Sequence, residues 1–246
     1  MNVELALLGF AVVVFAGYTV ETAAGFGSML VCVTFGAQLL DIREVVTLTV
    51  PVSILQSGYI ALRHRGSIEW KLLLRRILPL MGAGLLVGFL AFRDVQSAWL
   101  RPAFGAMVLV LALRELWVLH RGRAEVRKNP PAASVLAMLF AGVIHGVYAT
   151  GGPLLVYAVG REELDKHQFR STLSAVWLVL SVALGVGFLL DGRYDASSGR
   201  DILVLLPAVP LGLLLGEWLH RRIDERRFKT TVFVLLVVAA ISLLVH

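Results

Sequence analysis

Two glycine-containing breaks, 125 positions apart, interrupt very apolar stretches of this chain. The first break, residues 24–28, reads Ala-Gly-Phe-Gly-Ser, and the second, residues 149–153, reads Ala-Thr-Gly-Gly-Pro. A Phe-Ala-Gly triplet precedes each break, at 15–17 and 140–142. A helix that is interrupted in lipid must hide its freed backbone amides inside protein or in a wet cavity. Repeated interruptions mark a solute site between two repeats in membrane transporters, so the breaks predict a protein that moves a solute.

The composition indicates an integral membrane protein. Of the 246 residues, 58% are hydrophobic and only 16% are charged, whereas an average soluble domain has roughly 25% charged residues. The net charge of +6 is explained by the Lys and Arg that collect in the cytoplasmic loops of membrane proteins, so no nucleic-acid partner is expected. Cys32 is the one cysteine, which excludes a disulfide or a multi-cysteine metal site within the chain.

Ten apolar segments separated by polar residues can be read from the sequence. They cover approximately residues 3–22, 26–40, 45–62, 72–92, 98–119, 132–149, 151–160, 169–190, 201–219 and 228–245. The second and seventh fall short of the ~20 residues that cross a bilayer, so each could be half of a re-entrant hairpin. A full crossing by each segment is the alternative. We expect an all-α, polytopic fold with glycine-broken helices or re-entrant hairpins near the membrane midplane.

The distribution of Lys and Arg predicts the orientation of these segments. When loops are assigned alternately to the two sides of the membrane, eighteen of these residues fall on one side and five on the other. The positive-inside rule places the richer side in the cytoplasm and both termini outside it. The N-terminus has no basic leader, because Glu4 is the first charged residue, so the segment from Val3 onward is expected to be a retained first helix.

The two halves of the chain resemble each other. Residues 15–48 match residues 140–173 at ten positions when they are offset by 125. Each half holds five apolar segments, an odd number, so the halves are expected to form inverted repeats, as in many secondary transporters. The predicted organisation is a first transmembrane repeat at 1–119, a cytoplasmic linker at 120–131 and a second transmembrane repeat at 132–246.

Both halves also contain a Gly-x-x-x-Gly spacing. The first lies at 84–88 and the second at 212–216. Such spacings let two helix backbones approach closely, although they also arise by chance in glycine-rich membrane helices.

The break motifs and the hydroxyl-bearing segments that follow them resemble the TauE/SafE family of sulfite exporters and sulfonate-uptake-type permeases. The matching stretches are 24–28 with 47–49 (Thr-Leu-Thr), and 150–153 with 172–174 (Thr-Leu-Ser). The resemblance implies a secondary transporter of small sulfur-containing anions in the bacterial inner membrane. It favours export, and it implies coupling to the proton gradient. One departure is that Ser28-Met29 stands where family members often carry a proline, so the two breaks need not be equivalent.

The candidate binding residues lie at the breaks and in the third and eighth segments. A helix that begins at a break presents unsatisfied N–H donors and the positive end of its dipole, which suits an anion. Plain turns at the membrane surface are the alternative. Hydroxyl and amide side chains can add donors, although they often bond their own helix or a neighbouring one. The expected substrate-binding residues are Gly25, Phe26, Gly27, Ser28, Thr49, Gln56, Thr150, Gly151, Gly152 and Ser174.

Two ionisable residues precede the breaks and are candidates for proton coupling. His145 lies five residues before Thr150, and Glu21 lies four residues before Gly25. An ionisable residue inside a membrane segment is a functional hypothesis by default. His145 could instead be a neutral histidine bonded to a carbonyl, and Glu21 could lie at the cytoplasmic interface or repel a second anion.

Several functions are excluded by missing motifs. The sequence has no phosphate-binding Gly-x-x-x-x-Gly-Lys-Ser/Thr loop, which excludes an ATP-driven pump of that type, and no His-Glu-x-x-His motif, so no intramembrane metalloprotease is expected. We expect no enzyme activity, no cofactor and no metal. The expected partners are a small anionic substrate, protons and membrane lipids, and a homodimer is possible. A passive anion channel and a membrane assembly subunit without transport remain the alternative functions.

Overall fold

The fold is helical throughout the part that the structure describes. A computed structural model describes residues 3–91, 97–121, 130–159, 162, 164–222 and 224–245, and no strand occurs within these ranges. Seven helical stretches in these ranges are long and apolar enough to cross a membrane. The predicted all-α, polytopic class is therefore confirmed. Most of the predicted linker at 120–131 lies outside the described residues.

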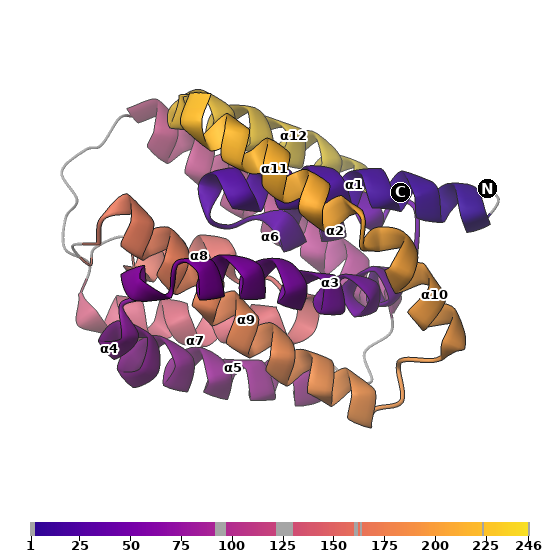
Figure 1. Cartoon of the computed structure of the whole chain (residues 1–246), viewed down its shortest axis with the longest axis horizontal. Helices are drawn as coiled ribbons and strands as arrows, with labels where there is room; N and C mark the ends of the chain where they lie inside the picture. Colours follow the sequence, from indigo (N-terminus) through magenta and orange to yellow (C-terminus); the bar gives the residue numbers. More distant parts are fainter. Residues whose placement is uncertain are drawn as a thin grey trace. The chain divides into compact units, whose positions relative to one another are not determined.

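The helices are numbered in chain order in Figure 1. Their bounds are α1 Val3–Ala24, α2 Ser28–Gly36, α3 Ile42–Arg63, α4 Trp70–Leu72, α5 Leu78–Ala91, α6 Ser97–Arg121, α7 Pro131–Tyr148, α8 Gly152–Val159, α9 Lys166–Leu190, α10 Ala196–Leu205, α11 Ala208–Arg222 and α12 Glu225–Val245. A 3-10 turn, η1 Arg65–Ser67, precedes α4, and a π-helical turn, η2 Leu73–Ile77, joins α4 to α5.

The two short apolar segments form short helices. Helix α2 has nine residues and α8 has eight, so they extend only about 13 Å and about 12 Å, against a hydrocarbon core of about 30 Å. Neither helix can cross the bilayer alone. The predicted ninth segment, 201–219, is divided between α10 and α11 at Pro207, which has no N–H to continue the helical ladder.

The chain divides into two compact units, and each unit combines segments from both sequence halves. Unit 1 comprises Met1–Val45, Val95–Arg127 and Pro207–His246, and unit 2 comprises Val46–Asp94 and Lys128–Leu206. In unit 1, α1 packs on α11 and α2, and α6 packs on α12. In unit 2, α7 packs on α5 and α8, and α5 also contacts α9.

In unit 1, the glycines of one Gly-x-x-x-Gly spacing bring α11 against α1. A Cβ atom added to Gly216 would lie 2.5 Å from Thr22 Cβ and 2.7 Å from the Thr19 carbonyl oxygen. A Cβ atom added to Gly212 would lie 3.0 Å from Tyr18 Cβ. The two helices can therefore pack this closely only because these positions lack side chains.

In unit 2, the other Gly-x-x-x-Gly spacing brings α5 against α7, and here glycines from both helices meet. A Cβ atom added to Gly84 would lie 2.9 Å from the Val143 backbone nitrogen, and one added to Gly88 would lie 2.9 Å from the Val143 carbonyl carbon. Conversely, a Cβ atom on Gly142 would lie 2.8 Å from Met81 Cα. The close helix approach predicted from both spacings is confirmed.

These contacts follow one pattern in both units. In unit 1, the glycine pair of α11 comes from the second half of the sequence and packs on α1, the helix before the first break. In unit 2, the glycine pair of α5 comes from the first half and packs on α7, the helix before the second break. In each unit, a glycine pair from one half of the sequence therefore packs on the helix that precedes the break of the other half. This symmetry supports the inverted repeat, which stays a prediction.

Candidate functional site

The first break joins α1 to α2 in unit 1 through two glycines in the left-handed backbone region. Gly25 has φ 85° and Gly27 has φ 110°, conformations that other residues adopt only with strain. Helix α2 then turns back and packs closely against α1. A Cβ atom on Gly17 would lie only 2.7 Å from Cys32 Sγ and 2.9 Å from the Ser28 carbonyl oxygen. Gly17, the last residue of the first Phe-Ala-Gly triplet, thus makes room for the returning helix.

A buried carboxyl group lies beside the start of α2. Glu21 is only 4% exposed, although it belongs to a helix long and apolar enough to span a membrane. The Ser28 hydroxyl, itself fully buried, donates a hydrogen bond to Glu21 Oε2. The first break therefore brings together Ser28, predicted to bind substrate, and Glu21, predicted to couple protons.

The other side of the first break is apolar. Phe26 and Gly27, two predicted substrate-binding residues, line a pocket of unit 1 whose remaining walls are hydrophobic. These walls come from Val20, Ala24, Leu30, Val232, Phe233 and Leu236. This pocket offers an anion little besides backbone groups, so the polar chemistry of the first break lies at Glu21 and Ser28.

The second break joins α7 to α8 in unit 2 by a different backbone route. Here Ala149 adopts the left-handed region, with φ 52°, and its N–H donates to the His145 carbonyl oxygen at 2.8 Å. Gly151 is needed for space, because a Cβ atom there would press on the Ala141 carbonyl group. Thr150, Gly151 and Gly152 are all buried, and α8 begins at Gly152.

His145, near the end of α7, is buried against α9. Its ring is stacked on Trp177, with ring centroids 5.8 Å apart and an interplanar angle of 13°. His145 is 1% exposed, and neither of its ring nitrogens has a hydrogen-bond partner within the described residues. The alternative that this histidine bonds a neighbouring carbonyl is therefore not realised.

Two further buried donors on α9 share this property. Within the described residues, Trp177 Nε1 and Ser174 Oγ also have no hydrogen-bond partner. Ser174 and Trp177 are three residues apart on a helix, so they lie on the same face. We call His145, Ser174 and Trp177 the donor cluster of unit 2.

The remaining predicted residues lie on α3. Thr49 donates from its hydroxyl to the Val46 carbonyl oxygen at 3.3 Å, the local bond that hydroxyls often form in helices. One turn further, Ser53 Oγ lies 3.2 Å from Ser181 Oγ, so α3 faces α9 in unit 2. Gln56 is fully buried one turn after Ser53.

Comparison with known proteins decides the family. The family model described as "Sulfite exporter TauE/SafE" matches residues 9–243. The chain belongs to the TauE/SafE family. Its resemblance to this family, inferred from the two break motifs, is therefore confirmed.

Two curated relatives match this TauE/SafE chain over most of their length. A protein of Comamonas testosteroni, described as "Probable inner membrane transporter protein TsaS", is 29% identical over 207 residues, 82% of each chain. A protein of Cupriavidus necator, described as "Probable sulfite/organosulfonate exporter TauE", is 24% identical over 222 residues, 87% of this chain and 84% of the relative. No solved structure gives a significant match.

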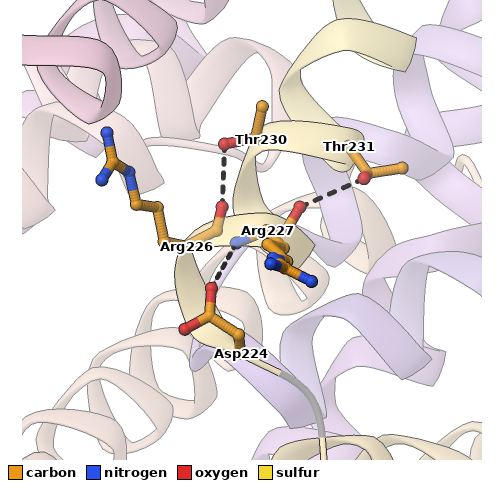
Figure 2. Close-up of a pocket in the computed structure, with 5 residues that line it drawn as sticks. All are labelled: Asp224, Arg226, Arg227, Thr230 and Thr231. Atoms are coloured by element: carbon orange, nitrogen blue, oxygen red, sulfur yellow. Dashed lines mark hydrogen bonds between the residues drawn. The ribbon is translucent and has the colours of Figure 1, made fainter.

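A second, basic region of this TauE/SafE chain lies at the start of α12. Asp224, Arg226, Arg227, Thr230 and Thr231 line a hollow in unit 1, and Figure 2 shows the two guanidinium groups pointing away from each other. Each nearby hydroxyl is already used inside the helix: Thr230 donates to the Arg226 carbonyl at 2.8 Å and Thr231 to the Arg227 carbonyl at 3.1 Å. The hollow therefore offers a substrate little besides two exposed guanidinium groups, and it is a weaker candidate site than the two breaks.

Sequence reasoning missed one member of the donor cluster. Trp177 lies in a long apolar run, where a tryptophan is usually a packing residue. Its spacing of three from Ser174 was the available signal, but spacing does not reveal whether a buried N–H finds an acceptor. That property emerges only from the packed structure.

The two breaks use glycine for different reasons. The order in which alanine and asparagine are tolerated should therefore differ between Gly27 and Gly151. At Gly27 the backbone is left-handed and an added Cβ atom meets only Val20, at 3.4 Å, so asparagine should be tolerated better than alanine. At Gly151 the obstacle is the Ala141 carbonyl, so the smaller alanine should be tolerated better. Thermal unfolding of the four variants in detergent measures this, and the same order at both sites would contradict it.

Proposed function

We propose that this chain is a multi-pass transporter of the bacterial inner membrane that exports small sulfur-containing anions, such as sulfite or organosulfonates. The observation that supports the proposal most strongly is the pair of buried helix starts, one in each unit, in a chain of the sulfite exporter TauE/SafE family. Broken helices within apolar segments supply the backbone donors that transporters use for anionic substrates. The names of the two relatives, an inner membrane transporter and a sulfite/organosulfonate exporter, point to the same location and substrates.

The proposed energy source is the proton gradient, and the proposed proton carrier is Glu21. A carboxylate is costly to bury in an apolar helix bundle, whereas the protonated acid is much less so, which suits a group that alternately binds and releases a proton. Tyr18 and Cys32 are two titratable side chains of unit 1 that lie near enough to interact with its charge. The Ser28 hydroxyl can hydrogen-bond the carboxyl in either protonation state.

The proposed transport cycle is alternating access. In inverted-repeat transporters, one part of the protein rocks against the other around a central substrate, so the site opens to one side of the membrane at a time. A passive anion channel is the competing function, and it would conduct without moving protons.

Methanesulfonate transport in proteoliposomes tests the proposal. Methanesulfonate carries no proton near neutral pH, so any proton movement that accompanies its flux must pass through the protein. We expect an imposed pH gradient to drive methanesulfonate uphill, and a methanesulfonate gradient to change the internal pH. Anion flux without a pH change would establish the channel instead, and no flux of methanesulfonate or sulfite would overturn the transport function altogether.

A further inference from the structure

In the part of unit 2 that the structure describes, a group of buried donors without acceptors lies at the end of α7 and on one face of α9. They are the ring of His145, the Ser174 hydroxyl and the Trp177 indole N–H. All three residues are nearly inaccessible, with exposed fractions of 1%, 0% and 6%. A buried donor without a partner is destabilising, and native proteins rarely leave one unused without a reason.

We propose that the donor cluster of unit 2 is the binding centre for the oxygen atoms of the transported anion, an assignment that rests on the proposed function. Neutral imidazole has one N–H donor, the indole has one, and the hydroxyl has one. Sulfite and sulfonate groups each present three oxygen atoms that accept hydrogen bonds. Three donors therefore match three acceptors.

The same chemistry argues against other ligands. The indole N–H of Trp177 can only donate, so it cannot coordinate a cation. The described residues contain no group of three or more His, Cys, Asp or Glu side chains that could hold a metal ion. A purely apolar ligand would leave all three donors unsatisfied, so an anion or a polar acceptor such as water is required.

The surroundings of the donor cluster support an anionic guest. Arg170, Ser174 and Trp177 are four and three residues apart on α9, so the arginine lies one turn from the hydroxyl along the same face. The stacking of His145 on Trp177 fixes the orientation of both rings before a ligand arrives. The binding groups themselves are neutral, which lets the anion leave again during each cycle.

Three substitutions that each remove one donor group test the assignment. His145→Phe keeps a stacked ring and removes both nitrogens, Trp177→Phe removes the indole N–H, and Ser174→Ala removes the hydroxyl. Each should weaken binding of methanesulfonate and sulfite by roughly ten- to a hundredfold, as expected for a lost hydrogen bond to a charged ligand. The melting temperature without ligand should stay the same or rise for His145→Phe and Ser174→Ala, because each removes an unsatisfied buried donor. Trp177→Phe also removes part of a buried ring system and leaves a cavity, so its melting temperature should fall even where the donor cluster is correctly assigned.

Isothermal titration of the full chain in detergent provides the affinities, with size-exclusion chromatography to verify folding. Two matched controls, His167→Phe and Trp70→Phe, change an exposed histidine and an exposed tryptophan and should leave both affinities unchanged. Unchanged affinities in all three cluster variants would overturn the donor cluster while leaving the proposed function intact. Loss of stability with wild-type affinity would also overturn it, since the donors would then serve packing or a bound water.

A different result would identify failure of the proposed function itself. If the wild-type chain bound neither anion and transported neither in proteoliposomes, the transporter assignment would fall and the donor cluster with it.

Discussion

Replacing Glu21 with glutamine should abolish proton-driven transport of methanesulfonate while leaving the fold intact. Glutamine has nearly the same shape as glutamate, and its carbonyl oxygen can still accept the hydrogen bond from Ser28. The amide cannot take up or release a proton, so net uphill transport should fall to the level of empty liposomes. Flux under an imposed pH gradient, recorded together with internal pH, measures this effect.

Exchange transport distinguishes a coupling defect from a binding defect. When methanesulfonate is present on both sides, exchange of labelled for unlabelled anion requires no net proton movement, so Glu21→Gln should retain it. Glu44→Gln is the matched control, because Glu44 is exposed at the start of α3 and should behave as wild type in both assays. Full proton-driven flux through Glu21→Gln would assign the coupling to another group.

The secondary structure was largely predictable because helix breaks have a strong local cause. Gly25 and Gly27 take backbone conformations that end one helix before the next begins, and their clustering is visible in the sequence. Helix α2 follows Gly27 and ends at Gly36, and α8 begins at Gly152, so glycines that are visible in the sequence mark the ends of these short helices. These features depend on neighbouring residues alone, so a single sequence is sufficient to predict them.

The assembly of the helices into units was not predictable in the same way. In a lipid environment, apolar residues can face either lipid or protein, so hydrophobic periodicity does not identify the packed face of a helix. Leu86 and Val87, for example, are exposed on α5, whereas Leu85 beside them is buried. Only the glycine spacings carried information about contacts, and they did not specify that α5 meets α7 or that α11 meets α1.

The candidate site shows the same division between local and distant causes. Ser28 and Glu21 are seven residues apart and join across one break, so their proximity is a consequence of the local turn. The stacking of His145 on Trp177 joins residues 32 positions apart on different helices. An unsatisfied donor is a property of a whole packed environment, which explains why the sequence suggested His145 and Ser174 but gave Trp177 no special place.

Replacing Gly142 with leucine should prevent unit 2 from folding. A side chain at this position would collide with backbone atoms of Met81 on α5, and backbone cannot move aside as a flexible side chain can. Overpacking of a core costs typically about 1–3 kcal/mol, and separating two helix backbones should exceed this range. Because whole proteins are stable by only about 5–15 kcal/mol, we expect aggregation or loss of the folded peak in size-exclusion chromatography.

The control for this prediction lies on the facing helix. Gly82 on α5 has no atom within 4 Å of an added Cβ, so Gly82→Leu should leave the melting temperature unchanged or raise it, since leucine favours helix more than glycine does. The two variants add the same leucine to unit 2 and differ in what the side chain meets. A folded Gly142→Leu protein with wild-type stability would show that α5 and α7 do not depend on backbone contact, and would remove the physical basis for the Gly-x-x-x-Gly packing in this unit.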